Sequence, residues 1–206
     1  MPEEESRLVR MATDEDMQKA FDAYALAVGK VAHEWNMLNE RLGQLFTVVV
    51  GARTPDVSLA VWNSSENDRA KQKMLKDAIQ SYHAKQWPWD IPVARTDLIW
   101  LADQALNLGE DRNNAVHAPC MLAIDHTGPL MIAHVVSRHA RASKLRGKPV
   151  LPEFEWVRLW ASELAMFAQR TETGLGWPDR YPWPDRPQKP ERPPKPSPGQ
   201  LSPMKG

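Results

Sequence analysis

The fold of this chain is decided by residues 21–49, which read FDAYALAVGKVAHEWNMLNERLGQLFTVV. Large apolar residues recur there at three- and four-residue steps: Phe21, Tyr24, Val28, Val31, Trp35, Leu38, Leu42, Leu45 and Val49. A 3.6-residue period sustained over this length predicts a long amphipathic helix. Thr13, followed by acidic residues, suits its N-cap, and Gly51 suits its end. A helix this long usually forms the spine of a bundle or a dimer interface.

Three more helices are predicted from their caps and apolar spacing. The first runs from about residue 65 to 83, after a short apolar cluster at 57–62. The second opens at Thr96 and stops before Pro119, with an apolar stripe made of Leu98, Leu101, Ala102, Ala105 and Leu108. The third covers 153–174, and its inward residues are expected to be Trp156, Leu159, Trp160, Leu164 and Phe167.

A change of pattern after Cys120 predicts a small β-hairpin. Residues 121–124 and 130–136 are mostly apolar, and the segment DHTGP at 125–129 between them favours a turn. The predicted fold class is therefore all-α: a bundle of four main helices with a small inserted β-hairpin and a disordered Pro-rich C-terminal tail.

The domain organisation follows from where the helical pattern begins and ends. Residues 1–12 are expected to be a flexible N-terminus, residues 13–176 one helical domain, and residues 177–206 a proline-rich tail. The tail has few apolar residues, so we expect it to be disordered or extended as polyproline II. RPPKP, residues 192–196, is a type of sequence that docks in aromatic grooves of partner proteins. A solvated tail without a ligand is the alternative.

Composition limits the classes of function. The 26 basic and 26 acidic residues balance, which argues against a protein that coats nucleic acid through overall charge. A single cysteine, an acidic start and short apolar runs indicate a soluble cytoplasmic protein without a membrane segment. The histidines and the cysteine lack zinc-ligand spacing, and no glycine-rich phosphate loop occurs. We therefore expect neither a metal nor another cofactor.

The candidate site is the hexad RNNAVH at residues 112–117. Asn113 and His117 are four residues apart, so they lie on one face of the predicted helix. Arg112 is in phase with the apolar stripe and therefore lies at the edge of the core. A guanidinium in that position needs a partner, which is either an internal acid, Glu34 or Glu40, or a bound phosphate.

The hexad contains the groups needed to cleave a phosphodiester without a metal. A guanidinium holds a phosphate with two hydrogen bonds and neutralises charge that develops on phosphorus. An imidazole takes a proton from a ribose 2′-hydroxyl or gives one to the leaving oxygen. Asn113 would orient the histidine or the substrate. The product would be a 2′,3′-cyclic phosphate, and DNA would not react because it lacks the 2′-hydroxyl.

On these residues the chain resembles the HEPN superfamily of helical-bundle ribonuclease and nucleotide-binding domains. Its hallmark is an arginine, a polar residue and a histidine late in one helix, often written RNxxxH, and Arg112, Asn113 and His117 match the three fixed positions. WNMLNERL, residues 35–42, is similar to bacterial members in which the first helix packs beside the motif. The resemblance covers about residues 17–175, while the hairpin and the proline-rich tail depart from the general pattern.

The resemblance implies metal-independent RNA cleavage by a homodimer that brings two motifs together. Many members are toxins or defence effectors, so an antitoxin or another partner protein that binds the tail is an expected partner besides RNA or a nucleotide. Asn39 and Glu40 are expected to support substrate binding, against the alternative of a solvated helix face. Two other functions remain open: a non-catalytic module that binds nucleotide or RNA, and a structural dimer that recruits a partner through its tail.

Overall fold

The computed structural model describes residues 13–51, 53–82, 89–125, 128–133, 145 and 149–194. Within these residues the chain forms five helices and one two-stranded antiparallel sheet. This arrangement confirms the expected mostly helical fold with an inserted hairpin. The predicted flexible N-terminus at 1–12 lies outside the described residues.

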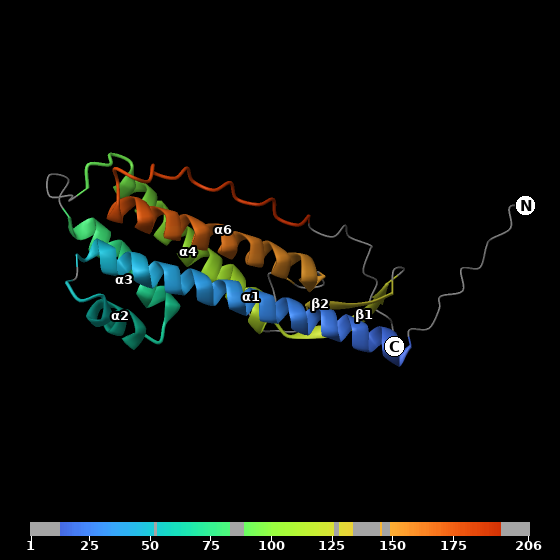
Figure 1. The fold of residues 1–206 in the computed structure, drawn as a ribbon. Helices are drawn as coiled ribbons and strands as arrows, with labels where there is room; N and C mark the ends of the chain where they lie inside the picture. The colour runs from blue at the N-terminus through green and yellow to red at the C-terminus, as the bar shows by residue number, and fades with distance from the viewer. Residues whose placement is uncertain are drawn as a thin grey trace, which may run out of the picture.

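Helix α1 (Asp14–Val49) is the longest helix among the described residues and runs along the whole bundle (Figure 1). Its 36 residues span about 54 Å at 1.5 Å per residue. Thr13 caps the helix through a capping box with Asp16, as its position before three acids predicts. The predicted start of this helix is therefore confirmed, and the helix ends one residue before the turn that contains Gly51.

Two shorter helices, α2 (Pro55–Ser64) and α3 (Asp68–Ser81), pack at one end of the bundle. The apolar cluster at 57–62 forms α2, although only Ser58 and Trp62 of this helix are buried. Its 10 residues are too few for the helical period to be evident in the sequence. Helix α3 agrees with the helix predicted at about 65–83, but it begins at Asp68, after the N-cap residue Asn67.

Helix α4 (Ala94–His117) carries the hexad in its last two turns. It ends at His117 because Ala118 precedes Pro119 and takes an extended conformation, with φ −67° and ψ 130°. The hairpin follows at once, as strands β1 (Cys120–Asp125) and β2 (Gly128–Ala133). Cys120 pairs with Ala133 and Asp125 with Gly128, whose φ of +121° suits a glycine.

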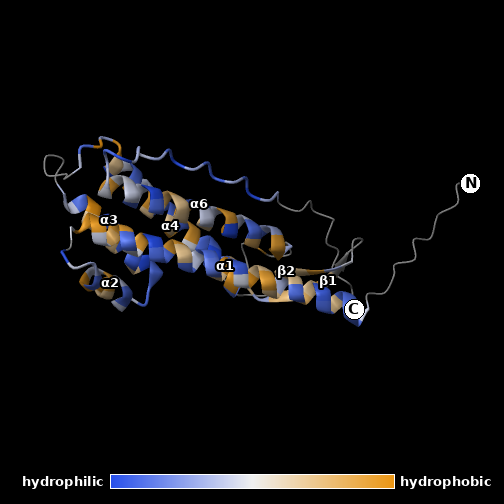
Figure 2. Ribbon diagram, in the orientation of Figure 1, coloured by the Kyte–Doolittle hydropathy of each residue, from blue (hydrophilic) through white to orange (hydrophobic). Residues whose placement is uncertain are grey.

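Helix α6 (Val150–Gly176) packs along α1 and completes the bundle. It begins three residues before the predicted start at 153, because Pro152 lies in the first turn, where a missing N–H is tolerated. Figure 2 shows apolar residues on the sides of the helices that face one another. Buried Trp35, Leu38, Leu98, Phe154 and Trp160 belong to this core, whereas Leu159, expected to point inward, is 40% exposed.

After α6 the chain turns back and runs along the bundle as an extended segment, drawn in red in Figure 1. Residues 177–194 of the proline-rich tail are described, and side chains of this segment contact α4 and α6. The extended form was one of the two expected for the tail, but its attachment to the bundle was not expected. The rest of the tail, 195–206, lies outside the described residues.

Candidate functional site

A groove of about 620 Å³ lies between α1, α2, α3 and α4, and Arg112 forms part of its wall. Helix α1 contributes Trp35, Asn39 and Glu40, and α3 contributes Lys71. Three residues that were predicted from sequence, Arg112, Asn39 and Glu40, therefore lie at one groove. Most of the remaining wall is polar, with asparagine and glutamine side chains at positions 36, 44 and 63.

Arg112 is half-buried and contacts an amide and an aromatic ring. Its Nη1 donates to Asn113 Oδ1 at 2.9 Å, and its guanidinium carbon lies 5.6 Å from the centre of the Trp35 ring. Within the described part of the chain, no ion pair to Arg112 is found, so neither Glu34 nor Glu40 is its partner. The internal acid that would explain this arginine as a structural residue is therefore absent from the described residues.

Trp35 reaches the guanidinium because α4 has a glycine at the point of contact. A Cβ atom on Gly109 would lie 3.1 Å from Trp35 Cη2, which is closer than most real Cβ contacts. The indole nitrogen of Trp35 donates to Asp68 Oδ2 at 2.8 Å and so fixes the ring against α3. The ring thus forms a rigid platform for Arg112, and a guanidinium stacked on an aromatic face remains able to bind an anion in its plane.

Among the described residues of the groove, two buried polar atoms are found without a hydrogen-bond partner: Arg112 Nε and Asn39 Oδ1. Leaving a buried donor or acceptor unpaired costs about 1–3 kcal/mol. The first is a donor and the second an acceptor.

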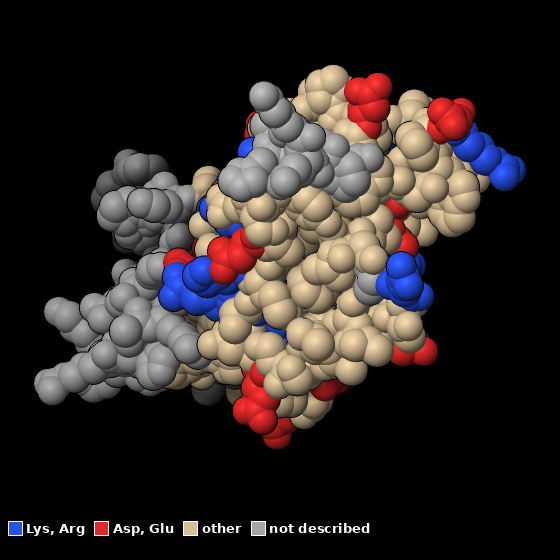
Figure 3. Space-filling view, turned by 90° about the vertical axis from the view of Figure 1, so that its left-hand side faces the viewer, with Lys and Arg blue, Asp and Glu red and all other residues tan. Residues whose placement is uncertain are grey.

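The groove carries two cations, Lys71 and Arg112, and two acids, Glu40 and Asp68. No ion pair is found for Lys71 among the described residues, whereas Asp68 accepts the Trp35 hydrogen bond. At the end of the bundle beside α2 and α3, Figure 3 shows mainly uncharged surface with small groups of opposite charge. An anion would therefore be attracted by the two cations of the groove itself, Arg112 and Lys71, and not by a wider basic surface at this end.

The other two residues of the motif lie apart from the groove wall. Asn113 is half-buried, and its amide oxygen orients the guanidinium of Arg112. His117 is exposed at the last position of α4, and within the described residues it is not part of the groove wall. Positions five apart on a helix are turned by about 140° and separated by about 7.5 Å along the axis. One chain therefore presents Arg112 and His117 in different directions.

Asn39 and Glu40, which are expected to support substrate binding, differ in their contacts. Asn39 Nδ2 donates to the backbone oxygen of Trp35 at 3.0 Å, which leaves its carbonyl oxygen unpaired. Glu40 is exposed and accepts a long hydrogen bond of 3.5 Å from Gln44. Both residues lie at the groove, but Glu40 is attached to its own helix alone in the described contacts.

Two residues contribute to this site in ways that were not predicted from the sequence, Lys71 and Trp35. Lys71 comes from α3, and no spacing in the sequence links it to the hexad. Trp35 was assigned to the core, but it also supports the arginine. The sequence did hold a signal for the contact of Trp35 with Arg112. The helical phase of Arg112 placed its guanidinium at the edge of a core that contains tryptophan.

Comparisons with models of protein families, with characterised proteins and with solved structures find no match to this chain. No helix among the described residues has the length and apolar character needed to cross a membrane. In the same part of the chain, no group of three or more His, Cys, Asp or Glu residues is placed to hold a metal ion. The case for a function therefore rests on the groove and the motif.

Proposed function

We propose that this protein is a metal-independent endoribonuclease of the HEPN type that acts as a homodimer. The observation that carries the proposal is the guanidinium of Arg112, which lines a polar groove and has no acidic partner among the described residues. An arginine at the edge of a core is costly unless something satisfies it, and a phosphate does so with two hydrogen bonds. The resemblance of the hexad to RNxxxH is the second support.

The chemistry assigns one task to each motif residue. His117 accepts the proton of a ribose 2′-hydroxyl, and the 2′-oxygen forms a bond to the adjacent phosphorus. The bond between phosphorus and the 5′-oxygen breaks, and that oxygen leaves with a proton from a second imidazole or from water. Arg112 neutralises the charge that grows on the phosphate oxygens, while Asn113 fixes the guanidinium. The products are a 2′,3′-cyclic phosphate and a 5′-hydroxyl.

The directions of the side chains support a dimer. Arg112 lies in the groove wall, whereas His117 is exposed on another side of α4. A two-fold axis beside the end of α4 would bring Arg112 of one subunit close to His117 of the other. Each dimer would then hold two composite sites.

Cleavage of RNA in the presence of EDTA tests the proposal. We expect wild-type protein to leave cyclic phosphate ends and to spare a strand with 2′-deoxyribose throughout. His117→Ala should lower the rate about 10²–10⁴-fold, which is the usual contribution of a general acid or base. Arg112→Ala should lower it about 10²–10³-fold, and Arg112→Lys should not restore it because a lysine lacks the planar fork.

The chain offers matched controls for both residues. Arg95 is another α4 arginine with an unpaired buried Nε, but it does not line the groove. His33 is an exposed histidine on α1 that lines a different groove. Arg95→Ala and His33→Ala should cut RNA at the wild-type rate. Wild-type protein that fails to cut any RNA in chelator, or variants of Arg112 and His117 that cut normally, would contradict the proposal.

One observation favours a second function, a binding module that does not cut. In a single chain His117 lies outside the groove wall, so a monomer would hold a phosphate without a proton-transfer group beside it. This function predicts that Arg112→Ala loses RNA or nucleotide binding, whereas wild-type protein binds and leaves the RNA intact. The same chelator experiment, with binding measured on the same samples, separates the two functions.

A further inference from the structure

Residues 183–192, WPDRPQKPER, contact the bundle at every third position. Four side chains of this segment bind α4 or α6: Trp183, Arg186, Lys189 and Arg192. An extended polyproline II helix has three residues per turn, so these four side chains share one face. The residues that follow them, at 184, 187, 190 and 193, are all prolines, and each is half-buried.

At one end of this segment, Asp97 of α4 accepts from two of the four side chains. Trp183 Nε1 donates to Asp97 Oδ2 at 2.7 Å, and Arg186 Nε donates to Asp97 Oδ1 at 2.6 Å. The Arg186 guanidinium also lies 5.1 Å from the centre of the Trp100 ring. Asp97 is only 7% exposed.

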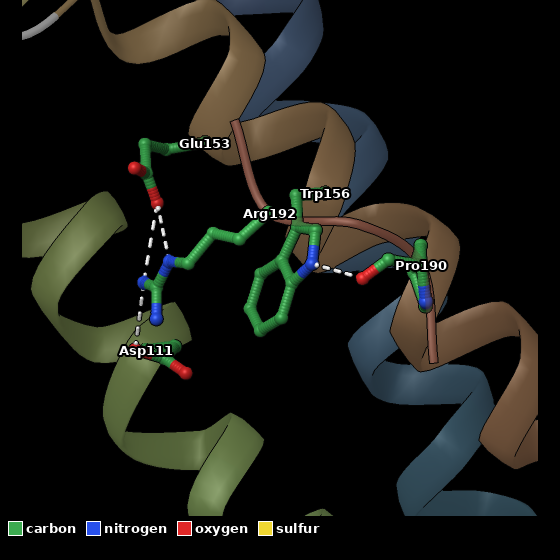
Figure 4. Close-up of polar contacts among 5 residues, drawn as sticks. All are labelled: Asp111, Glu153, Trp156, Pro190 and Arg192. Carbon is green, nitrogen blue, oxygen red and sulfur yellow. Dashed lines mark hydrogen bonds and ion pairs between the residues drawn. The ribbon is translucent and has the colours of Figure 1, made fainter. Parts of the chain in front are cut away.

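At the other end, Arg192 joins α4 to α6. It donates to Asp111 Oδ1 at 2.9 Å and to Glu153 Oε2 at 3.2 Å, and its guanidinium lies 4.6 Å from the centre of the Trp156 ring. Trp156 donates its indole N–H to the carbonyl of Pro190 at 3.0 Å. Figure 4 shows the arginine extended between the two carboxylates beside the indole.

Between these ends, the Lys189 ammonium nitrogen lies 5.4 Å and 5.9 Å from the ring centres of Trp156 and Trp160. Aromatic rings that receive prolines, together with acids that receive cations at fixed spacing, are the features by which proteins recognise polyproline II ligands. In this protein the tryptophan rings lie beside the cations of the segment, acids pair with two of those cations, and one indole N–H donates to a proline carbonyl.

The attachment consists mainly of side-chain contacts near the surface. Among the described residues of 183–192, Pro190 is the one whose backbone is hydrogen-bonded to the bundle. The side chains of Arg186 and Arg192 remain 41% and 47% exposed. Such contacts break without disruption of the core. Removal of the segment would, however, leave the buried carboxylate of Asp97 without its described side-chain partners, Trp183 and Arg186. Because an unpaired buried charge is costly, a ligand that displaces the segment should bring a cation of its own to Asp97.

From these contacts we infer that the α4–α6 face is a recognition site for proline-rich basic segments of other polypeptides. The face is formed by Asp97, Trp100, Asp111, Glu153, Trp156 and Trp160, and residues 183–192 occupy it as a displaceable ligand of the same chain. The partner is a polypeptide in extended form with an arginine or lysine at every third position, each followed by a proline. This inference does not depend on RNA cleavage.

Binding of a labelled peptide with the sequence of residues 183–194 to the full chain tests the inference. The segment of the same chain competes at an effective concentration of about millimolar, so the peptide should bind wild-type protein weakly. The double variant Arg186→Ala and Arg192→Ala weakens this competitor, and we expect the peptide to bind about tenfold more tightly. Asp185→Ala with Glu191→Ala changes two exposed residues without described side-chain contacts to the bundle, so binding should match the wild type.

Two further measurements locate the site and test the spacing. Asp111→Asn, combined with the double variant, should weaken peptide binding about tenfold through loss of a charge-assisted bond. A peptide of the same composition with its cations two and four residues apart should bind no variant. Equal binding of both peptides, or no gain of affinity in the double variant with its helical circular dichroism intact, would overturn the inference.

Discussion

Replacement of Arg112 by alanine should have little effect on the free energy of unfolding. Two favourable contacts disappear: the hydrogen bond to Asn113, worth about 0.5–1.5 kcal/mol, and the contact with the Trp35 ring, worth about 0.5–1 kcal/mol. The substitution also removes the unpaired buried Nε, whose presence costs about 1–3 kcal/mol. The gains and losses are of similar size, so we expect a net change within about 1 kcal/mol.

Urea unfolding followed by tryptophan fluorescence measures this quantity, since the chain has nine tryptophans. Arg95→Ala is the matched control, because Arg95 has the same unpaired Nε in the same helix. Loss of about 3 kcal/mol or more in Arg112→Ala would contradict this expectation, because losses of that size follow when one partner of a buried ion pair is removed. The arginine would then be a structural residue.

Saturating ligand extends the same measurement to function. A 2′-O-methyl RNA strand binds without being cut, and at about 100 times its Kd it should stabilise wild-type protein by about 2.7 kcal/mol. Arg112→Ala should show no such stabilisation, whereas Arg95→Ala should be stabilised like the wild type. A stabilised Arg112→Ala protein would place RNA binding elsewhere on the molecule.

Three further predictions concern the fold. Asp97→Ala should lower the free energy of unfolding in urea by about 2 kcal/mol, because Trp183 and the partly exposed Arg186 both lose their acceptor. A change below measurement error would contradict the attachment of the segment. Gly43→Ala should cost about 1–3 kcal/mol, because its Cβ would lie 2.9 Å from the buried Trp62 ring, whereas Gly29→Ala, with open space around it, should be stabilising by about 0.5–1 kcal/mol. Burial, together with the neighbouring Cys120 thiol, raises the pKa of Tyr24 to about 12 from its ordinary 10.0. The unfolded chain loses this proton first, so stability should fall as pH rises from about 10 towards 12, and an ultraviolet titration in which every tyrosine ionises near pH 10 would exclude the shift.

The long elements of the fold were predictable because each has a complete local signal. In α1 the N-cap signal at Thr13 and the regular spacing of nine apolar residues between Phe21 and Val49 predict the same helix. In α4 the apolar stripe and Pro119 define the helix and its end. Helix α2 was missed because its 10 residues are too few to show an apolar period, although Thr54, Pro55 and Asp56 are typical of a helix start. Its one large buried side chain is Trp62.

The attachment of residues 177–194 was not predictable from composition. A tail without attachment was expected because the segment has few apolar residues. The segment is instead held by hydrogen bonds and ion pairs of its guanidinium and indole groups. The acids that receive them, Asp97 and Asp111, lie on a helix more than 70 residues earlier in the chain. For the candidate site, helical phase predicted Arg112 at the edge of the core, where it lies half-buried, but Lys71 depends on the packing of α3.

We propose that Arg112 of one subunit cleaves RNA together with His117 of its partner. Mixing Arg112→Ala protein with His117→Ala protein, each inactive alone, tests it directly in chelator. After subunit exchange, half of the dimers hold one intact composite site, so we expect about a quarter of wild-type activity to return. A mixture that contains mixed dimers and remains inactive, beside active wild-type protein, would show that the two groups act within one chain.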